Sequence, residues 1–127
     1  SPAMVERHVM PWIEQLAETF GGVFLHYCGL HKGLFELSCR SHAVQAIDLG
    51  NCEMYDPRWL LERCAESNTV LYSRLAALPD ERWDAYTRRL GLLVHETGAR
   101  CILRPVVYPT DRAGCADMLQ MWHELTQ

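Results

Sequence analysis

The sequence predicts an α/β fold in which four parallel strands alternate with helices. Apolar runs of strand length recur four times, amphipathic helical stretches lie between them, and Gly, Asn, Asp or Pro residues separate the two kinds of segment. Alternating strands and helices form parallel βαβ units with right-handed crossovers. Because four strands are too few to close a barrel, we expect half of a (β/α)8 TIM-type barrel, or alternatively a small open three-layer α/β sheet.

The first two strands and their helices follow from apolar spacing. The helix predicted over 5–19 carries an apolar stripe, with Pro11 as a kink or late start, and a Gly-Gly pair ends it. A buried strand over 22–28 and a short helix over 32–39 come next. The second strand, 43–49, ends where a Gly-Asn pair breaks the apolar run.

The second half of the chain repeats this alternation. The Asp-Pro pair at 56–57 combines an N-cap with proline at the first helical position, so a helix begins there. A third strand covers 69–75, and a long helix over 79–98 ends at a glycine. The fourth strand covers 101–107, and Asp111 caps the last helix.

The composition is that of a single globular domain. The chain has 127 residues, of which 49% are hydrophobic and 22% charged, which predicts one α/β domain over 4–127. Residues 1–3 precede Met4 and resemble a remnant of cloning. A net charge of −4 argues against nucleic-acid binding. Apolar runs stay below the roughly 18 residues of a membrane span.

The cysteine pattern indicates free thiols. Six cysteines are present, and none of them forms a CxxC pair. We therefore expect a reducing, cytoplasmic compartment rather than a disulfide scaffold. Cys39, Cys64 and Cys115 fall on predicted helices, where we expect them to face the core as small hydrophobic side chains.

Polar side chains lie at the carboxyl ends of the predicted strands. They are His26, Cys28, Asp48, Arg74, Arg104 and Tyr108. The carboxyl ends of parallel strands meet at one edge of a sheet, where the sites of α/β proteins lie. Asp48 and Tyr108 are the candidate catalytic residues. We expect Arg74 and Arg104 to face the same cavity as His26 and Asp48 and to bind an anionic substrate.

The His-x-Cys pair at the end of the first strand suggests a metal. Residues two apart in a strand share a face, so His26 and Cys28 point the same way. Imidazole and thiolate are natural zinc ligands, and a catalytic zinc needs three protein ligands. Cys52 and His31 are candidates for the third. The alternative is a packed strand end that binds no metal.

Four segments together resemble a known superfamily. They read "FGGVFLHYCG", "AIDLG", "YDPRWLLERC" and "GARCILRPVVYPTDRAG". From about Phe20 to its end, the chain resembles the C-terminal part of the uroporphyrinogen decarboxylase superfamily, which includes cobalamin-dependent methyltransferases acting on coenzyme M and related thiols. The resemblance implies a (β/α)8 barrel of which this chain supplies about the last four strands.

The resemblance also implies roles for particular residues. His26 and Cys28 match the HxCG motif of the methyltransferase branch, whose His and Cys bind zinc and activate the acceptor thiol, and Asp48 matches an acidic residue at the end of the next strand. A corrinoid methyl donor is implied in the same way. The branch's third zinc ligand, a cysteine at the end of the last strand, has no counterpart in residues 105–108. The N-terminal arginine cluster of the decarboxylases is absent as well.

Three interpretations of function follow. The first is a methyltransferase-like or decarboxylase-like catalytic site at the strand ends, and methyl transfer to a zinc-activated thiol is its favoured chemistry if the chain is active. The second is a non-catalytic half-barrel that binds an anionic small molecule or a protein partner, such as a corrinoid protein. The third is a fragment of a full-length enzyme.

A half-barrel would leave one face of its sheet open. The residues expected there are Phe24, Val44, Ala46, Val70, Tyr72 and Ile102. Each large apolar side chain left in water forfeits roughly 1.5–3 kcal/mol of burial. We therefore expect a homodimer in which a second chain covers this face, or a sheet that carries helices on both faces.

Overall fold

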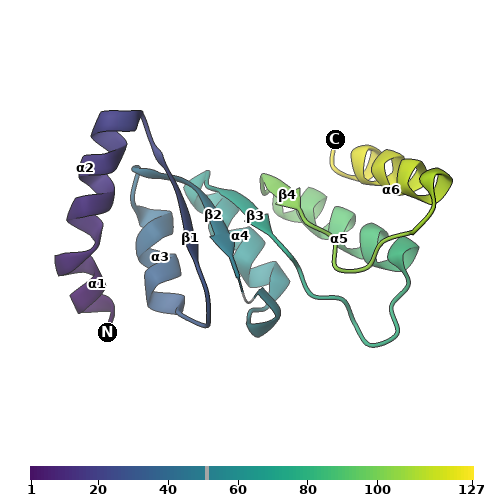
Figure 1. The fold of residues 1–127 in the computed structure, drawn as a ribbon, viewed down its shortest axis with the longest axis horizontal. Helices are drawn as coiled ribbons and strands as arrows, with labels where there is room; N and C mark the ends of the chain where they lie inside the picture. Colours follow the sequence, from purple (N-terminus) through teal and green to yellow (C-terminus); the bar gives the residue numbers. More distant parts are fainter. Residues whose placement is uncertain (51) are drawn as a thin grey trace.

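A computed structural model describes residues 1–50 and 52–127, apart from the side chain of Cys52 (Figure 1). The strands are β1 (Val23–Tyr27), β2 (Val44–Leu49), β3 (Val70–Ser73) and β4 (Cys101–Leu103). The helices are α1 (Pro2–His8), α2 (Met10–Phe20), α3 (Lys32–Arg40), the 3-10 turn η1 (Cys52–Met54), α4 (Pro57–Ser67), α5 (Trp83–Thr97) and α6 (Arg112–Leu125).

The strands form one parallel sheet in the order β1-β2-β3-β4. The predicted α/β class, with four parallel strands alternating with helices, is therefore confirmed. The register places His26 beside Asp48 and Asp48 beside Tyr72. Neighbours in sequence are neighbours in space, because one crossover connects each pair of strands.

Helices cover one face of this sheet. Ile47 and Leu71 lie on that face and are fully buried. They join a core that includes Phe35 from α3, Leu60 from α4 and Leu90 from α5. In Figure 1 the strands pass in front of α4 and α5. Successive side chains of a strand point to opposite faces, so the strand residues next to these buried ones lie on the other face of the sheet.

The opposite face, here called the uncovered face, carries Phe24, Ala46, Val70, Tyr72 and Ile102, with His26 and Asp48 at its carboxyl end. Phe24 and Ile102 are 57% and 56% exposed. The ring of Phe24 packs edge-on against Tyr72 with 5.5 Å between ring centroids. No described helix shields these side chains from solvent.

The prediction that Val44 lies on the uncovered face was wrong. Val44 is 3% exposed and belongs to the core. The pairing of β1 with β2 shifts between Val23 and Phe24, which pair with Val44 and Ala46, so Gln45 is an extra residue in β2. Such a bulge changes the face on which the preceding side chain lies.

Several element boundaries also differ from the prediction. The fourth strand ends at Leu103 instead of 107, because Pro105 has no N–H to continue the ladder. The third ends at Ser73. The first helix is divided into α1 and α2 around Val9, two residues before the proline in α2. Cys115 is exposed rather than buried in the core.

The predicted helix starts at residues 56 and 111 are confirmed by their caps. The Asp56 carboxylate accepts the Trp59 N–H at 2.8 Å, and the Asp111 carboxylate accepts the Gly114 N–H at 2.9 Å. These bonds satisfy donors that a helix leaves unpaired at its first turn. None of the described helices combines the length and apolar character needed to cross a membrane.

Candidate functional site

His26 and Asp48 meet at the carboxyl end of the uncovered face. They are paired in the register of β1 and β2, and His26 Nδ1 lies 2.9 Å from Asp48 Oδ2. A carboxylate can only accept a hydrogen bond, so Nδ1 carries the proton. In the neutral form of the ring, the lone pair then lies on the other nitrogen, Nε2.

Cys28 completes this arrangement one residue after β1. Its Sγ lies 3.5 Å from His26 Nε2, and the residue is exposed. Gly50 makes room for the thiol, since a Cβ at this position would come within 2.4 Å of Cys28 Sγ. The Gly50 N–H also donates to the Tyr27 carbonyl at 2.9 Å, which holds the two strand ends together. Sequence reasoning missed Gly50, although a glycine directly after a strand is a recognisable signal.

Arg104 reaches the same carboxylate on the same face of the sheet, from the edge formed by β4. Its Nη2 donates to Asp48 Oδ1 at 2.9 Å, and its guanidinium lies 4.7 Å from the centroid of the Tyr72 ring. The Arg104 N–H donates to the Ser73 carbonyl at 2.9 Å, which fixes its backbone against β3. Both oxygens of Asp48 are thus engaged, and its side chain is only 11% exposed. Tyr72, which supports Arg104, was not among the predicted site residues.

The other predicted site residues lie apart from this group. Arg74 follows the last residue of β3 and is exposed, and no described contact joins it to His26 or Asp48. Tyr108 is 61% exposed in the loop between β4 and α6. Cys52 begins η1, but its side chain lies outside the described residues. The structure therefore brings together His26, Cys28, Asp48 and Arg104.

His31, the other candidate for a third metal ligand, is used as a helix cap. Its Nδ1 accepts the Leu34 N–H at 2.9 Å at the start of α3, and its own N–H donates to the Tyr55 hydroxyl. Within residues 1–50 and 52–127, no group of three or more His, Cys, Asp or Glu side chains is placed to hold a metal.

Two donors nevertheless have the spacing of zinc ligands. Zinc lies about 2.0–2.1 Å from an imidazole nitrogen and about 2.3 Å from a thiolate sulfur, so a tetrahedral angle places the two donors about 3.6 Å apart. The distance from His26 Nε2 to Cys28 Sγ is 3.5 Å. A zinc-binding histidine usually donates its second ring N–H to a carboxylate, as His26 does to Asp48.

The buried thiols provide a contrast to Cys28. Burial raises the pKa of Cys101 to about 12. A hydrogen bond with Cys39, together with burial, raises the pKa of Cys64. Thiols in such surroundings stay protonated and are poor nucleophiles and metal ligands. Of these cysteines, only Cys28 combines exposure with an adjacent imidazole.

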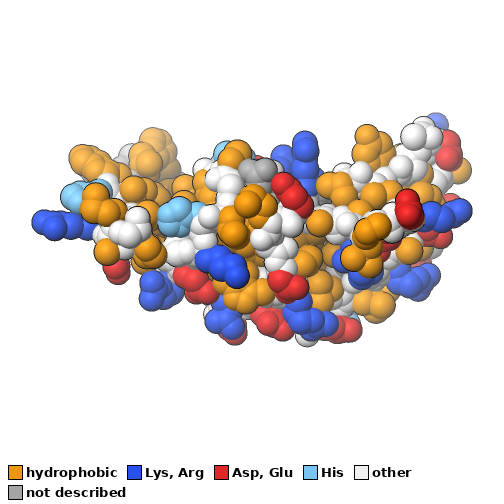
Figure 2. Space-filling model, turned by 90° about the horizontal axis from the view of Figure 1, so that it is seen from below, with side chains coloured by type: hydrophobic (Ala, Val, Ile, Leu, Met, Phe, Trp, Pro, Cys, Tyr) orange, Lys and Arg blue, Asp and Glu red, His pale blue; other side chains and the backbone are white. Residues whose placement is uncertain are grey.

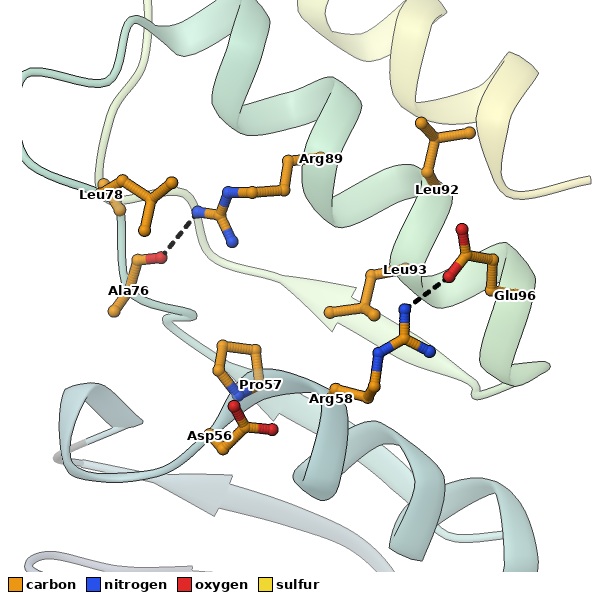
Figure 3. Close-up of a pocket in the computed structure, with 10 residues that line it drawn as sticks. Asp56, Pro57, Arg58, Ala76, Leu78, Arg89, Leu92, Leu93 and Glu96 are labelled. Carbon is orange, nitrogen blue, oxygen red and sulfur yellow. Dashed lines mark hydrogen bonds and ion pairs between the residues drawn. The ribbon is translucent and has the colours of Figure 1, made fainter.

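A separate cavity of about 540 Å³ lies between the start of α4 and helix α5 (Figure 3). Its ionic side chains are already engaged. Arg58 pairs with Glu96 at 2.6 Å, and Arg89 donates to the Ala76 carbonyl at 3.0 Å. The lining residues that are described include none of the predicted site residues, so this cavity does not extend the strand-end group.

Comparisons with models of protein families, with curated proteins and with solved structures found no match.

Proposed function

We propose that this chain binds zinc through His26 and Cys28 and that its favoured chemistry is methyl transfer to a zinc-activated thiol. The observation that carries the proposal is the 3.5 Å spacing of His26 Nε2 and Cys28 Sγ, with Nδ1 held by Asp48. When bound, zinc would lower the pKa of a coordinated acceptor thiol and supply a thiolate at neutral pH.

The chain's own residues have distinct parts in this proposal. Asp48 is a positioning residue that keeps the proton on Nδ1 of His26 and so directs the lone pair of Nε2 toward Cys28. Arg104 balances the charge of Asp48 and holds its second oxygen. Arg74, exposed beyond the end of β3, is the candidate to bind an anionic part of the substrate. The third metal ligand would be Cys52 or a group from outside the chain.

The proposed architecture is half of a (β/α)8 barrel. Two observations support it: the strands follow one another in sequence order, and the helices cover one face only. A doubly wound sheet would reverse its strand order at a switch point and carry helices on both faces. The resemblance to the cobalamin-dependent methyltransferases supports a corrinoid methyl donor.

Metal content tests the proposal directly. Protein purified in the presence of zinc and then desalted should carry close to one zinc per chain by elemental analysis. Cys28→Ser should lose the metal, because it removes a thiolate ligand. Cys115→Ser is the matched control, since Cys115 is also exposed but lies on α6, and it should keep the metal.

A metal-free wild-type protein, or a Cys28→Ser variant with full zinc occupancy, would reject the zinc site. Activity is tested separately with methylcobalamin and a small thiol, by following the loss of the methylated corrinoid spectrum. Zinc binding without turnover would reject the methyl transfer and leave a metal-binding half-barrel.

The non-catalytic alternative has one observation in its favour. The Arg74 side chain is exposed at the edge of the sheet where ligands of α/β proteins bind. A small dicarboxylate that binds the metal-free protein, and binds Arg74→Gln more weakly, would support an anion-binding function.

A further inference from the structure

We propose that the uncovered face of the sheet is the contact surface for a second copy of this chain. The inference is independent of the zinc proposal, because it rests on exposed area and charge rather than on the strand-end ligands.

The exposed area of the chain is larger than its mass requires. A compact monomer of 14.6 kDa should expose about 6,900 Å². The chain exposes 7732 Å², an excess of about 800 Å². A standard protein–protein interface buries about 800 Å² on each partner. One partner of ordinary interface size would therefore remove the excess.

The uncovered face has the composition of an interface centre. Phe24 and Ile102 are more than half exposed, and the ring of Phe24 packs against the ring of Tyr72. Exposed aromatic and aliphatic residues of this kind are enriched at the centres of interfaces. The burial that they lack in the monomer would be supplied by the same residues of a second copy.

Charge favours a copy of the same chain. Asp48 is the only Asp, Glu, Lys or Arg within the four strands, and Arg104 neutralises it. In a two-fold dimer, the same surface of each copy forms the interface. A net charge on that surface would therefore repel its counterpart, and the uncovered face carries none. Figure 2, seen from below, shows acidic and basic side chains gathered on the convex side of the molecule, away from this face.

A second apolar surface lies on helix α2, which exposes Trp12, Leu16 and Phe20. With 3.6 residues per turn, Glu14 and Glu18 lie on the opposite side of this helix, so charge does not disfavour a contact there. The stripe is only one helix wide, whereas the uncovered face extends across all four strands. We therefore assign the contact to the sheet and not to α2.

The proposal does not require the two sheets to close edge to edge. A closed eight-stranded barrel places one helix between neighbouring strands. Here α2 precedes β1 and α6 follows β4, so two copies would bring both helices to the same junction. If the two uncovered faces pack against each other and the sheet edges stay apart, α2 and α6 do not compete for one position.

Sedimentation velocity at micromolar concentration tests the inference. The wild-type chain should sediment with twice its mass of 14.6 kDa. Ile102→Glu places a charge on the uncovered face at strand β4, and we expect it to weaken dimerisation at least about tenfold. Leu16→Glu, on the exposed side of α2, is the matched control and should remain dimeric. Circular dichroism checks that each variant is folded, and Phe24→Glu replaces Ile102→Glu if that variant unfolds.

A wild-type chain that stays monomeric at these concentrations overturns the proposal and leaves the face to a different partner. A dimer that survives both sheet substitutions, or that Leu16→Glu dissociates, overturns it as well, because the contact then lies elsewhere.

Discussion

Replacing Asp48 by Asn tests whether this carboxylate organises the strand-end group. The substitution keeps the shape of the side chain but removes its charge and one acceptor oxygen. An Asn amide can donate to His26 Nδ1, which would move the ring proton to Nε2 and direct an N–H toward Cys28. Arg104, whose side chain is 33% exposed, would lose its anionic partner.

The structure sets the size of both effects. Asp48 accepts two hydrogen bonds of 2.9 Å. Bonds to charged groups contribute about 1.5–3 kcal/mol each when they are buried. His26 is 54% exposed and Arg104 is partly exposed, so water screens both bonds, and we expect a total loss of stability of about 2 kcal/mol. Loss of the carboxylate behind a zinc-binding histidine should weaken zinc binding about 10- to 100-fold.

Two assays measure these effects separately. Competition with a chromophoric chelator gives the zinc affinity, and urea unfolding of the metal-free protein gives the stability. Asp84→Asn is the control, because it removes the same charge from an exposed carboxylate on α5 and should leave both quantities unchanged. If Asp48→Asn binds zinc as tightly as the wild type, then Asp48 does not orient His26 for zinc by keeping its proton on Nδ1.

Three further predictions concern the surroundings of the site and the core. Gly50→Ala retains both His26 and Cys28 but should weaken zinc binding in the chelator assay, because its Cβ would displace the Cys28 thiol; unchanged affinity contradicts this. Tyr86→Phe should lower the free energy of unfolding by about 1–3 kcal/mol, because it removes a buried hydrogen bond of 2.6 Å to a backbone carbonyl, and a change within error would contradict it. Hydrogen bonds from Arg89 lower the pKa of Glu81, so its contribution to stability is present above the unfolded pKa of about 4.3 and is lost as pH falls through the lower folded pKa. Glu81→Gln should therefore make the free energy of unfolding in urea less dependent on pH in that acid range. An unchanged pH dependence would show that the ionisation of Glu81 does not contribute to it.

Local signals accounted for most of the secondary structure. The cap at Asp56 and the glycine after α5 act within a few residues of themselves, so their effect is visible in the sequence. Strand ends were predicted less well, because pairing with a neighbour decides where a strand stops. The fourth strand was expected to reach residue 107, yet Arg104 makes the last bond to β3 before Pro105.

Part of the candidate site was also visible in the sequence. The period of a strand places His26 and Cys28 on one face whatever the fold, and the end of β2 identifies Asp48. Arg104 was expected to face the same cavity as Asp48, but the ion pair between them was not predicted. It joins residues 56 positions apart, and Arg104 reaches β2 across β3, past the ring of Tyr72.

The sequence by itself determined the alternation of helices and strands, the caps and the two donors at the end of β1, because each depends on spacing along the chain. The tertiary structure decided the rest. A bulge at Gln45 moved Val44 into the core, and the packing of α6 left Cys115 exposed. It also paired Arg104 with Asp48. These outcomes depend on distances between strands and helices, and such distances exist only once the chain has folded.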